Sequence, residues 1–283
     1  MQALVSLIYA ARKVQFWWQW ILNSSIGRWS IPPALLVILV LALAMRITGI
    51  GWDQYNFFHP DERSIFMRAE CMYLILSEGP GWESCTEDSA FELTEPGIPS
   101  IGTFFDPSKS PLNPHWFPLG TFLIYVLVWI KALASPIFSM DIRDLAIAGR
   151  MLSTIADLAS IALVYLLGKK LYGRNAGLLA ALLVAFAVVH IQHSHYYRPE
   201  TFSNALTLAA FWSMLKVSSE NRLRDSAFLG LFVGLALATK ASTLPIVLPT
   251  VALYGYLFWI MVSDRFLRER RDGTGLALSL IHI

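Results

Sequence analysis

Long apolar runs, separated by short polar and basic segments, dominate the pattern of the chain. A helix needs roughly 20 apolar residues to cross the hydrocarbon of a bilayer, so these runs are too long for core strands and predict membrane helices. We expect such helices at residues 32–50, 149–168, 175–191, 200–217, 225–243 and 244–262. The predicted fold is therefore an all-α, polytopic transmembrane helix bundle.

A long outer loop, residues 51–148, follows the first predicted span. Directly after Asp61 and Glu62, apolar residues recur over residues 65–76 with the spacing of one helical stripe, which predicts a juxtamembrane helix lying on the bilayer. Residues 77–115 are rich in Gly, Pro, Ser and acids, and we expect them to form a loop that orders over the site.

Basic residues report orientation, because Lys and Arg stay on the cytoplasmic side of a membrane. Arg12, Lys13 and Arg28 precede the first span without an acid, whereas residues 51–115 carry eleven acids against three basic residues. The N-terminus is therefore expected in the cytoplasm and residues 51–115 outside. Three basic clusters follow later in the chain, at residues 169–174, 216–224 and 265–271. They lie in the cytoplasm only if residues 116–138 do not cross the bilayer, so we interpret this segment as an interfacial or re-entrant helix.

Composition agrees with a membrane protein, since 55% of the residues are hydrophobic, 15% are charged and the mean hydropathy is +0.53. The net charge of +2 indicates no particular partner, and nothing in the sequence resembles a nucleic-acid-binding surface. We divide the chain into a cytoplasmic or interfacial segment at 1–31, a transmembrane module at 32–262 and a basic cytoplasmic tail at 263–283 that is expected to be truncated. Trp-rich residues 4–22 predict an interfacial amphipathic helix.

The chain has two cysteines, Cys71 and Cys85, and both lie in the outer loop. Extracytoplasmic space is oxidising, so a disulfide that closes this short loop is one interpretation. Two free or buried thiols are the other, because sequence does not give the geometry that a disulfide needs.

Two adjacent carboxylates, Asp61 and Glu62, follow His59 and Pro60 about ten residues after the first apolar run. The pattern is that of a helix start, with proline at the first position and acids in the first turn. A carboxylate beside the exit of a membrane helix can also meet a lipid-linked donor and an aqueous acceptor. It can then take the proton from an attacking hydroxyl as a general base. Both interpretations can hold together.

Three basic side chains lie at ends of predicted spans, on the face opposite the cytoplasmic clusters: Arg150, Arg198 and Lys240. Arg198 can fork two hydrogen bonds onto a phosphate, with Glu200 orienting it or an acceptor, and a local ion pair that caps the helix is the alternative. Arg150 and Lys240 either snorkel or bind phosphate. Asp157, within a span, is either a buried partner for a neighbouring helix or functional.

Three histidines, His190, His193 and His195, lie between two predicted spans. Their spacing does not place all three on one helical face, and no cysteine or carboxylate set completes a metal site. Histidine and tyrosine are also ordinary residues at a membrane interface. We therefore expect no metal ion here.

Several segments, taken in order, resemble the membrane-embedded glycosyltransferases of the C-type fold, near the protein mannosyltransferase and aminoarabinose transferase families. They are the Asp61-Glu62 pair, residues 113–120 (Asn-Pro-His-Trp-Phe-Pro-Leu-Gly), residues 149–153 (Gly-Arg-Met-Leu-Ser), and Tyr197-Arg198-Pro199-Glu200 followed by Ala238-Thr239-Lys240. Residues 113–120 are similar to that family's His-Pro-Pro-Leu-Gly, with the second proline replaced by Trp116 and Phe117 in a shifted arrangement. The resemblance covers about residues 30–260.

The resemblance implies an inverting transfer of a sugar from a polyprenyl phosphate to an acceptor hydroxyl at the outer, extracytoplasmic face of the membrane. It implies Asp61 as the base, Glu62 as its support and His59 as a group that shapes its environment. The departing phosphate gains negative charge and would be stabilised by cations. These cations are Arg150, Arg198 and Lys240, with His195 and Glu200 in supporting roles.

The expected partners are the polyprenyl-phosphate sugar, membrane lipids and an acceptor that is a protein, a glycan or a lipid; no cofactor is expected. A multi-span transporter or lipid flippase without glycosyl transfer is the alternative, and a membrane scaffold that binds a partner is another. The polar groups collect at one face and no internal repeat is evident, which favours the enzyme. Relatives of this kind carry further spans, so we expect the chain to be an N-terminal fragment.

Overall fold

The computed structural model describes residues 32–78, 117–220 and 222–280, six single positions between 102 and 114, and side chains as far as residue 263. These residues form helices and no strand, which confirms the all-α class. The amphipathic helix expected at 4–22 and most of the loop expected at 77–115 lie outside the described residues.

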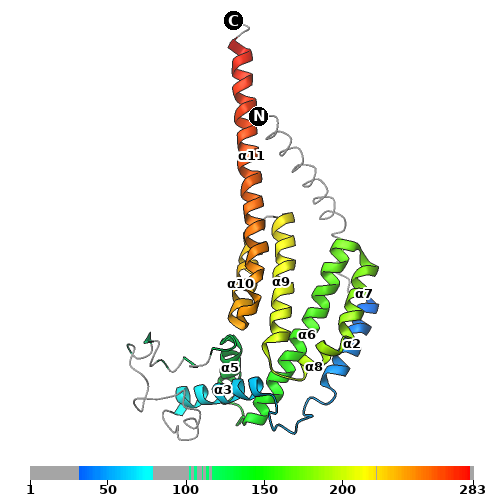
Figure 1. Ribbon diagram of the computed structural model, residues 1–283, viewed down its shortest axis with the longest axis vertical. Coiled ribbons are helices and arrows are strands. Elements are labelled where there is room, and N and C mark those ends of the chain that lie inside the picture. Colours follow the sequence, from blue (N-terminus) through cyan, green and yellow to red (C-terminus); the bar gives the residue numbers. More distant parts are fainter. Residues whose placement is uncertain are drawn as a thin grey trace.

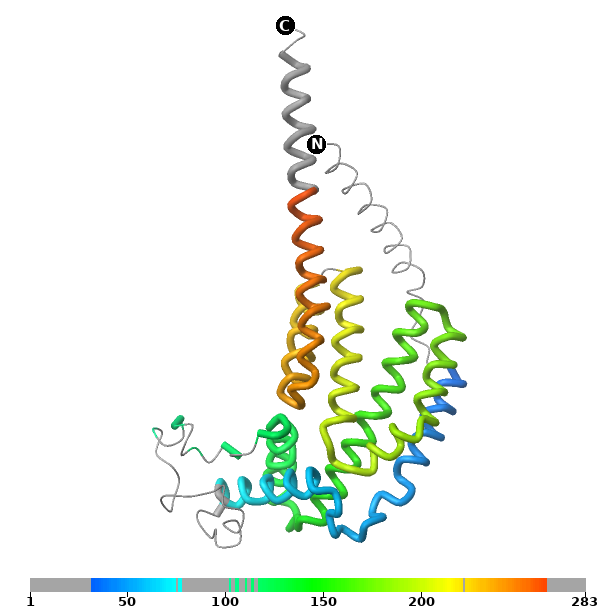
Figure 2. Tube along the Cα trace, in the orientation of Figure 1, coloured from blue at the N-terminus to red at the C-terminus, as the bar shows by residue number. Residues whose placement is uncertain are grey.

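Helices that run side by side form a bundle, and further helices lie at one of its ends (Figure 1). The bundle helices are α2 (Pro33–Ile47), α6 (Ile142–Tyr172), α7 (Arg174–Ala185), α9 (Pro199–Glu220), α10 (Leu223–Thr239) and α11 (Val247–Leu280). The elements at that end are α3 (Pro60–Glu78), α5 (Phe122–Ala134), α8 (Val188–Ser194) and the 3-10 helix η2 (Ala241–Ile246). Helix α3 runs across the end of the bundle (Figure 2), as a juxtamembrane helix would.

The outer surface of the bundle is apolar, with large side chains such as Leu36, Leu183 and Phe258 exposed. Among the described residues, Ile142–Tyr172 and Ala241–Ser263 are long and apolar enough to cross a membrane, and α7 with α8 adds a third span if the bent pair counts as one. An extended apolar surface of this kind marks contact with lipid. The chain is an integral membrane protein.

The helix expected at 175–191 is wrong as a single element, because α7 and α8 are bent by 59° at a break. Ala187, just before α8, adopts an extended backbone. The bend brings His190 of α8 to Asp157 of α6, where Nδ1 lies 2.6 Å from a carboxylate oxygen. A tertiary contact thus accompanies a break that no proline or glycine in the local sequence announces.

Other helix boundaries also differ from the expected ones, most of all the end of α11, which continues to Leu280, past the expected residue 262 and through most of the expected tail. Helix α6 begins at Ile142, before the expected residue 149, because Asp141 forms a capping box: its side chain accepts from the backbone N–H of Asp144, whose own side chain accepts from Asp141. Helix α10 ends at Thr239, before the expected residue 243, and Lys240 adopts an extended backbone. This extended residue directs the Lys240 side chain away from the helix axis.

Helix α5 has 13 residues, a length of about 20 Å that falls short of the roughly 30 Å hydrocarbon core. Its Lys131 is buried, pairs with Glu70 of α3 and lies 5.0 Å from the centre of the Tyr73 ring. These contacts hold α5 to α3. The length favours the interfacial interpretation of residues 116–138, which stays a prediction.

Three apolar clusters fill the interior. One joins α2, α6 and α7, and another joins α9, α10, η2 and α11. The largest lies beneath the charged residues described below and joins α3, α5, the start of α6 and the segment before α9; its members include Phe66, Ile124, Leu145 and Tyr197. This third cluster fixes the two segments that carry Asp61 and Arg198.

Residue 120 lies against the end of α10. The backbone N–H of Gly120 donates to the carbonyl oxygen of Thr239 at 3.1 Å. A Cβ at position 120 would lie 1.9 Å from the carbonyl oxygen of Ala238, so only glycine fits. The contact fixes the segment before α5 to the chain immediately before Lys240.

Candidate functional site

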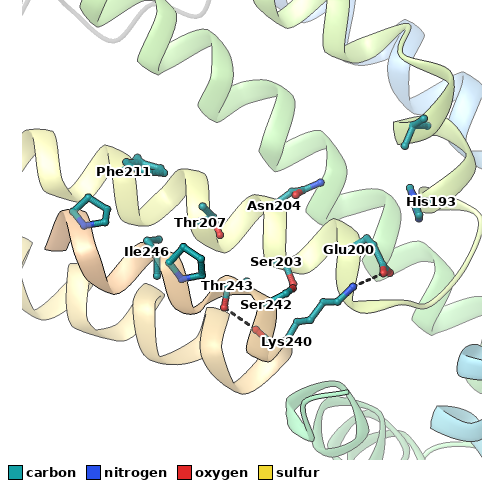
Figure 3. Close-up of a pocket in the computed structure, with 13 residues that line it drawn as sticks. His193, Glu200, Ser203, Asn204, Thr207, Phe211, Lys240, Ser242, Thr243 and Ile246 are labelled. Carbon is teal, nitrogen blue, oxygen red and sulfur yellow. Dashed lines mark hydrogen bonds and ion pairs between the residues drawn. The ribbon is translucent and has the colours of Figure 1, made fainter. Parts of the chain in front are cut away.

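Alternating charges form a row at the end of the bundle where α3 lies. The Arg198 guanidinium lies 3.6 Å from Asp61 and 3.2 Å from Glu200, measured from Nη2 to carboxylate oxygens. The Lys240 ammonium donates to the same oxygen of Glu200 at 2.8 Å (Figure 3). The row therefore unites the N-terminus of α3, the start of α9 and the end of α10. It brings together four residues that the sequence predicted as a site.

Asp61 lies in the first turn of α3, after Pro60 at the first helical position. Its side chain is 37% exposed, and at the distance given above its ion pair with Arg198 is weak. The helix-start interpretation is thus confirmed. The same carboxylate is open to water and can receive a proton from an incoming hydroxyl, so the two interpretations are compatible.

His59 lies just before α3, and its Nδ1 accepts a hydrogen bond from the backbone N–H of Asp61 at 3.2 Å. Burial, assisted by the nearby Arg198 charge, lowers the pKa of His59 below 6.5. An Nδ1 that accepts and a lowered pKa both indicate a neutral imidazole. The His59 ring also lies edge-on to the Tyr196 ring, with centroids 5.3 Å apart.

Arg150 is fully buried behind this row and uses all of its donors. Its guanidinium makes hydrogen bonds of 2.8 to 2.9 Å to both carboxylate oxygens of Asp53, both of Glu62 and the carbonyl oxygen of Ile50. A guanidinium has five N–H groups, so none remains for a phosphate. The geometry therefore speaks against the predicted phosphate contact of Arg150.

Asp53 is a buried member of this cluster that sequence reasoning missed. Besides Arg150, its carboxylate accepts from the backbone N–H groups of Tyr55 and Phe57, each at 3.1 Å. The hydrogen bonds from Arg150 hold the pKa of Asp53 below its usual value. The loop that it organises places Gln54, Tyr55 and Phe57 at positive φ. An acid at the exit of one span, opposite an arginine at the start of another, is the signal that could have found it.

Glu62 joins the two segments that carry the exposed charges. One of its oxygens accepts both from Arg150 Nε at 2.9 Å and from the backbone N–H of Tyr197 at 2.8 Å. Glu62 follows Asp61 in sequence, and Tyr197 precedes Arg198. The buried carboxylate thus fixes the spacing between the Asp61 carboxylate and the Arg198 guanidinium, which agrees with a supporting role.

The three histidines of the 190–195 segment point to different partners. His190 contacts Asp157, and His195 places its two ring nitrogens 2.7 and 2.8 Å from the carbonyl oxygens of Ile191 and Thr48. His193 lines the cavity described below. Within the described part of the chain, no three His, Cys, Asp or Glu side chains gather as a metal site would require.

Asp157 is a buried partner for a neighbouring helix, one of the two alternatives that the sequence left open. One of its oxygens accepts from Arg46 Nε of α2 at 2.6 Å, and both side chains are fully buried. Arg46 also donates to the carbonyl oxygens of Ala42 and Ala185. Sequence reasoning missed Arg46, since a single arginine at the end of an apolar run looks like a snorkelling residue.

A cavity of about 470 Å³ opens beside the Glu200 and Lys240 pair, between α9 and η2 (Figure 3). Its polar lining comes from Glu200, Ser203, Asn204, Thr207, Lys240, Ser242, Thr243 and His193. Its apolar lining comes from Val189, Phe211, Pro245, Ile246 and Pro249. The row of charges thus borders a pocket whose size suits a small ligand.

Cys71 of α3 is disulfide-bonded. Cys85, the other cysteine of the sequence, lies outside the described residues. The first of the two alternatives for the cysteines is therefore the one found at Cys71.

A family model described as dolichyl-phosphate-mannose-protein mannosyltransferase matches residues 125–283, more than half of the chain. The match includes Arg150, Arg198 and Lys240, whereas Asp61 lies before it. No curated protein and no solved structure matches the chain.

Proposed function

Because the chain belongs to the dolichyl-phosphate-mannose-protein mannosyltransferase family, we propose that it transfers a sugar from a polyprenyl-phosphate donor to an acceptor hydroxyl. The observation that carries the proposal is the row of charges: a water-exposed carboxylate, Asp61, lies 3.6 Å from the cation of Arg198, and the row continues to Glu200 and Lys240, which line a pocket. Glycosyl transfer from a lipid phosphate needs a base and a phosphate site close together, and this row offers a candidate for each.

In the proposed reaction, the acceptor hydroxyl donates its hydrogen bond to Asp61 and attacks C1 of the sugar. The bond between C1 and the phosphate oxygen breaks as the new glycosidic bond forms, and the electron pair leaves with the phosphate. The proton passes to the Asp61 carboxylate. Attack from the face opposite the phosphate inverts the configuration at C1.

Arg198 and Lys240 are the groups proposed to stabilise the phosphate. The ion pairs of Arg198 with Asp61 and Glu200 both use Nη2, and the side chain is 18% exposed, so its other terminal nitrogen, Nη1, is available to an oxyanion. Lys240 donates to Glu200, and its flexible stem can turn the ammonium towards a phosphate. Donors placed where charge develops lower the barrier directly.

Arg150 and Glu62 are proposed to position these groups without contacting the substrate. Their hydrogen bonds to each other, with the one that Glu62 accepts from the backbone N–H of Tyr197, hold the start of α3 and the segment before α9 in register. We also propose that the site faces the extracytoplasmic side of a multi-pass protein, because the acids of the outer loop and the basic clusters of the sequence separate in this way.

The test is transfer of labelled sugar from a polyprenyl-phosphate donor by the purified protein, with Asp61→Asn as the variant. Loss of a general base lowers the rate by roughly 10²- to 10⁴-fold, while binding of the donor should persist. Glu220→Gln removes a carboxylate at the far end of α9, where it pairs with Arg222, and serves as the control. If the Asp61→Asn variant transferred sugar at the wild-type rate, the assignment of Asp61 as the base would be wrong.

A further inference from the structure

Three residues that line the cavity beside Lys240 each carry a buried polar atom without a hydrogen-bond partner among the described residues: His193 Nδ1, Glu200 Oε2 and Ser203 Oγ. The Ser203 residue is only 7% exposed. Buried polar atoms are nearly always paired, and an unpaired one costs free energy. The three residues thus carry hydrogen-bonding capacity that the protein itself does not use, and small rotations of their side chains would turn it towards a polar ligand in the cavity.

The polar lining continues along one face of α9. Glu200, Ser203, Asn204 and Thr207 follow the three- and four-residue spacing of a helix face, and all four line the cavity (Figure 3). Ser242 and Thr243 of η2 face them, next to Lys240. Carboxylate, amide and hydroxyl groups thus surround the half of the cavity that is nearest to the row of charges.

The polar lining indicates which part of a lipid-linked sugar, the prenyl chain or the sugar ring, fits the cavity. A prenyl chain has no hydrogen-bonding groups and would leave the polar side chains that line the cavity without partners. A sugar ring carries hydroxyls, each of which both donates and accepts, and so matches a carboxylate that only accepts and a serine that does both. The cavity volume of about 470 Å³ also falls within the range of small-ligand pockets.

We propose that this cavity holds the sugar ring of the donor, and that Ser203 and Asn204 determine which sugar is accepted. The proposal rests on the proposed glycosyl transfer and adds where the sugar lies. With the ring in the cavity, C1 faces the end that Glu200 and Lys240 line, from which the row of charges continues to Arg198 and Asp61.

The test compares binding of two lipids to the purified protein in nanodiscs: polyprenyl phosphate, and the same lipid carrying mannose or glucose on its phosphate. The variants are Ser203→Ala and Asn204→Ala. Each should weaken binding of a glycosylated lipid by roughly two- to ten-fold, the effect of one neutral hydrogen bond, and leave binding of the sugar-free lipid unchanged. Ser213→Ala is the matched control, because this buried serine of α9 donates to Ala209 and lies outside the cavity.

Equal weakening of both lipids by the Ser203 and Asn204 variants would overturn the proposal and assign the cavity to the prenyl chain. Unchanged binding of both lipids, or a wild-type protein that gains nothing from the sugar, would also overturn it. Thermal unfolding of each variant shows whether a loss reflects misfolding. Because binding is measured without transfer, a protein that binds the sugar selectively and transfers none would refute the proposed function and leave the pocket assignment standing.

Discussion

Replacing Arg150 with methionine tests whether this residue holds the site together. Arg150→Met keeps much of the side-chain length but removes all five hydrogen bonds and leaves the carboxylates of Asp53 and Glu62 buried together. Removing one partner of a buried ion pair costs about 3–5 kcal/mol. We expect a loss in that range, with the unpaired acids repelling each other at neutral pH.

The assay is thermal unfolding of purified wild-type and variant protein in the same detergent. A loss of 3–5 kcal/mol should lower the melting temperature by roughly 6–20 °C in a chain of this size. Adding Glu62→Gln to Arg150→Met removes one of the stranded charges, so the double variant should be more stable than Arg150→Met alone. This recovery is specific to the buried pair and would not follow from a general loss of packing.

The control is Arg198→Met, which removes a cation from the partly exposed row. Its ion pairs with Asp61 and Glu200 are worth about 0–1 kcal/mol, so the melting temperature should change little while transfer is lost. The reasoning would be refuted if Arg150→Met melted like the wild type and lost only binding of polyprenyl phosphate. That result would return Arg150 to the phosphate-binding role that the sequence predicted.

Two further changes test other buried groups. His59 has a folded-state pKa below 6.5, so its contribution to stability is complete above pH 6.5 and is lost as the pH falls towards the folded-state pKa. His59→Asn keeps an acceptor for the Asp61 backbone N–H and should remove this loss of stability in acid. Unfolding at pH 7.5 and pH 5 is the measurement, and equal acid sensitivity of the wild type and the variant would contradict the expectation. Asp157→Asn leaves Arg46 buried without its charge partner and should lower the free energy of unfolding by about 3–5 kcal/mol, measured by thermal unfolding. The control Glu220→Gln, at the end of α9, should have little effect.

The helices could largely be predicted from the sequence, because apolar runs and helical periodicity are local properties. The break between α7 and α8 could not, since no local signal marks it and the contact that accompanies it joins His190 to Asp157, 33 positions away. The early start of α6 follows from the Asp141 cap, a local signal that apolar runs alone do not include.

Within the site, the sequence identified the row of Asp61, Arg198, Glu200 and Lys240 because these residues stand at the ends of predicted helices. The sequence could not distinguish these residues from Arg150, because hydropathy also places Arg150 at the end of a predicted helix. The difference is burial, and burial depends on Asp53, which reaches Arg150 from a loop 97 positions away. Burial of this kind arises only when distant segments pack together.

The contact between residue 120 and the end of α10 has a consequence for how the sequence can drift over evolutionary time. A single methyl group at Gly120 would meet the backbone at Ala238, and backbone, unlike a side chain, cannot be exchanged for something smaller by a second mutation. Gly230 and Gly234 have open space around an added Cβ and carry no such restriction. Selection should therefore hold position 120 fixed in every functional descendant of this chain, even where the helices on either side of the contact have changed most of their residues.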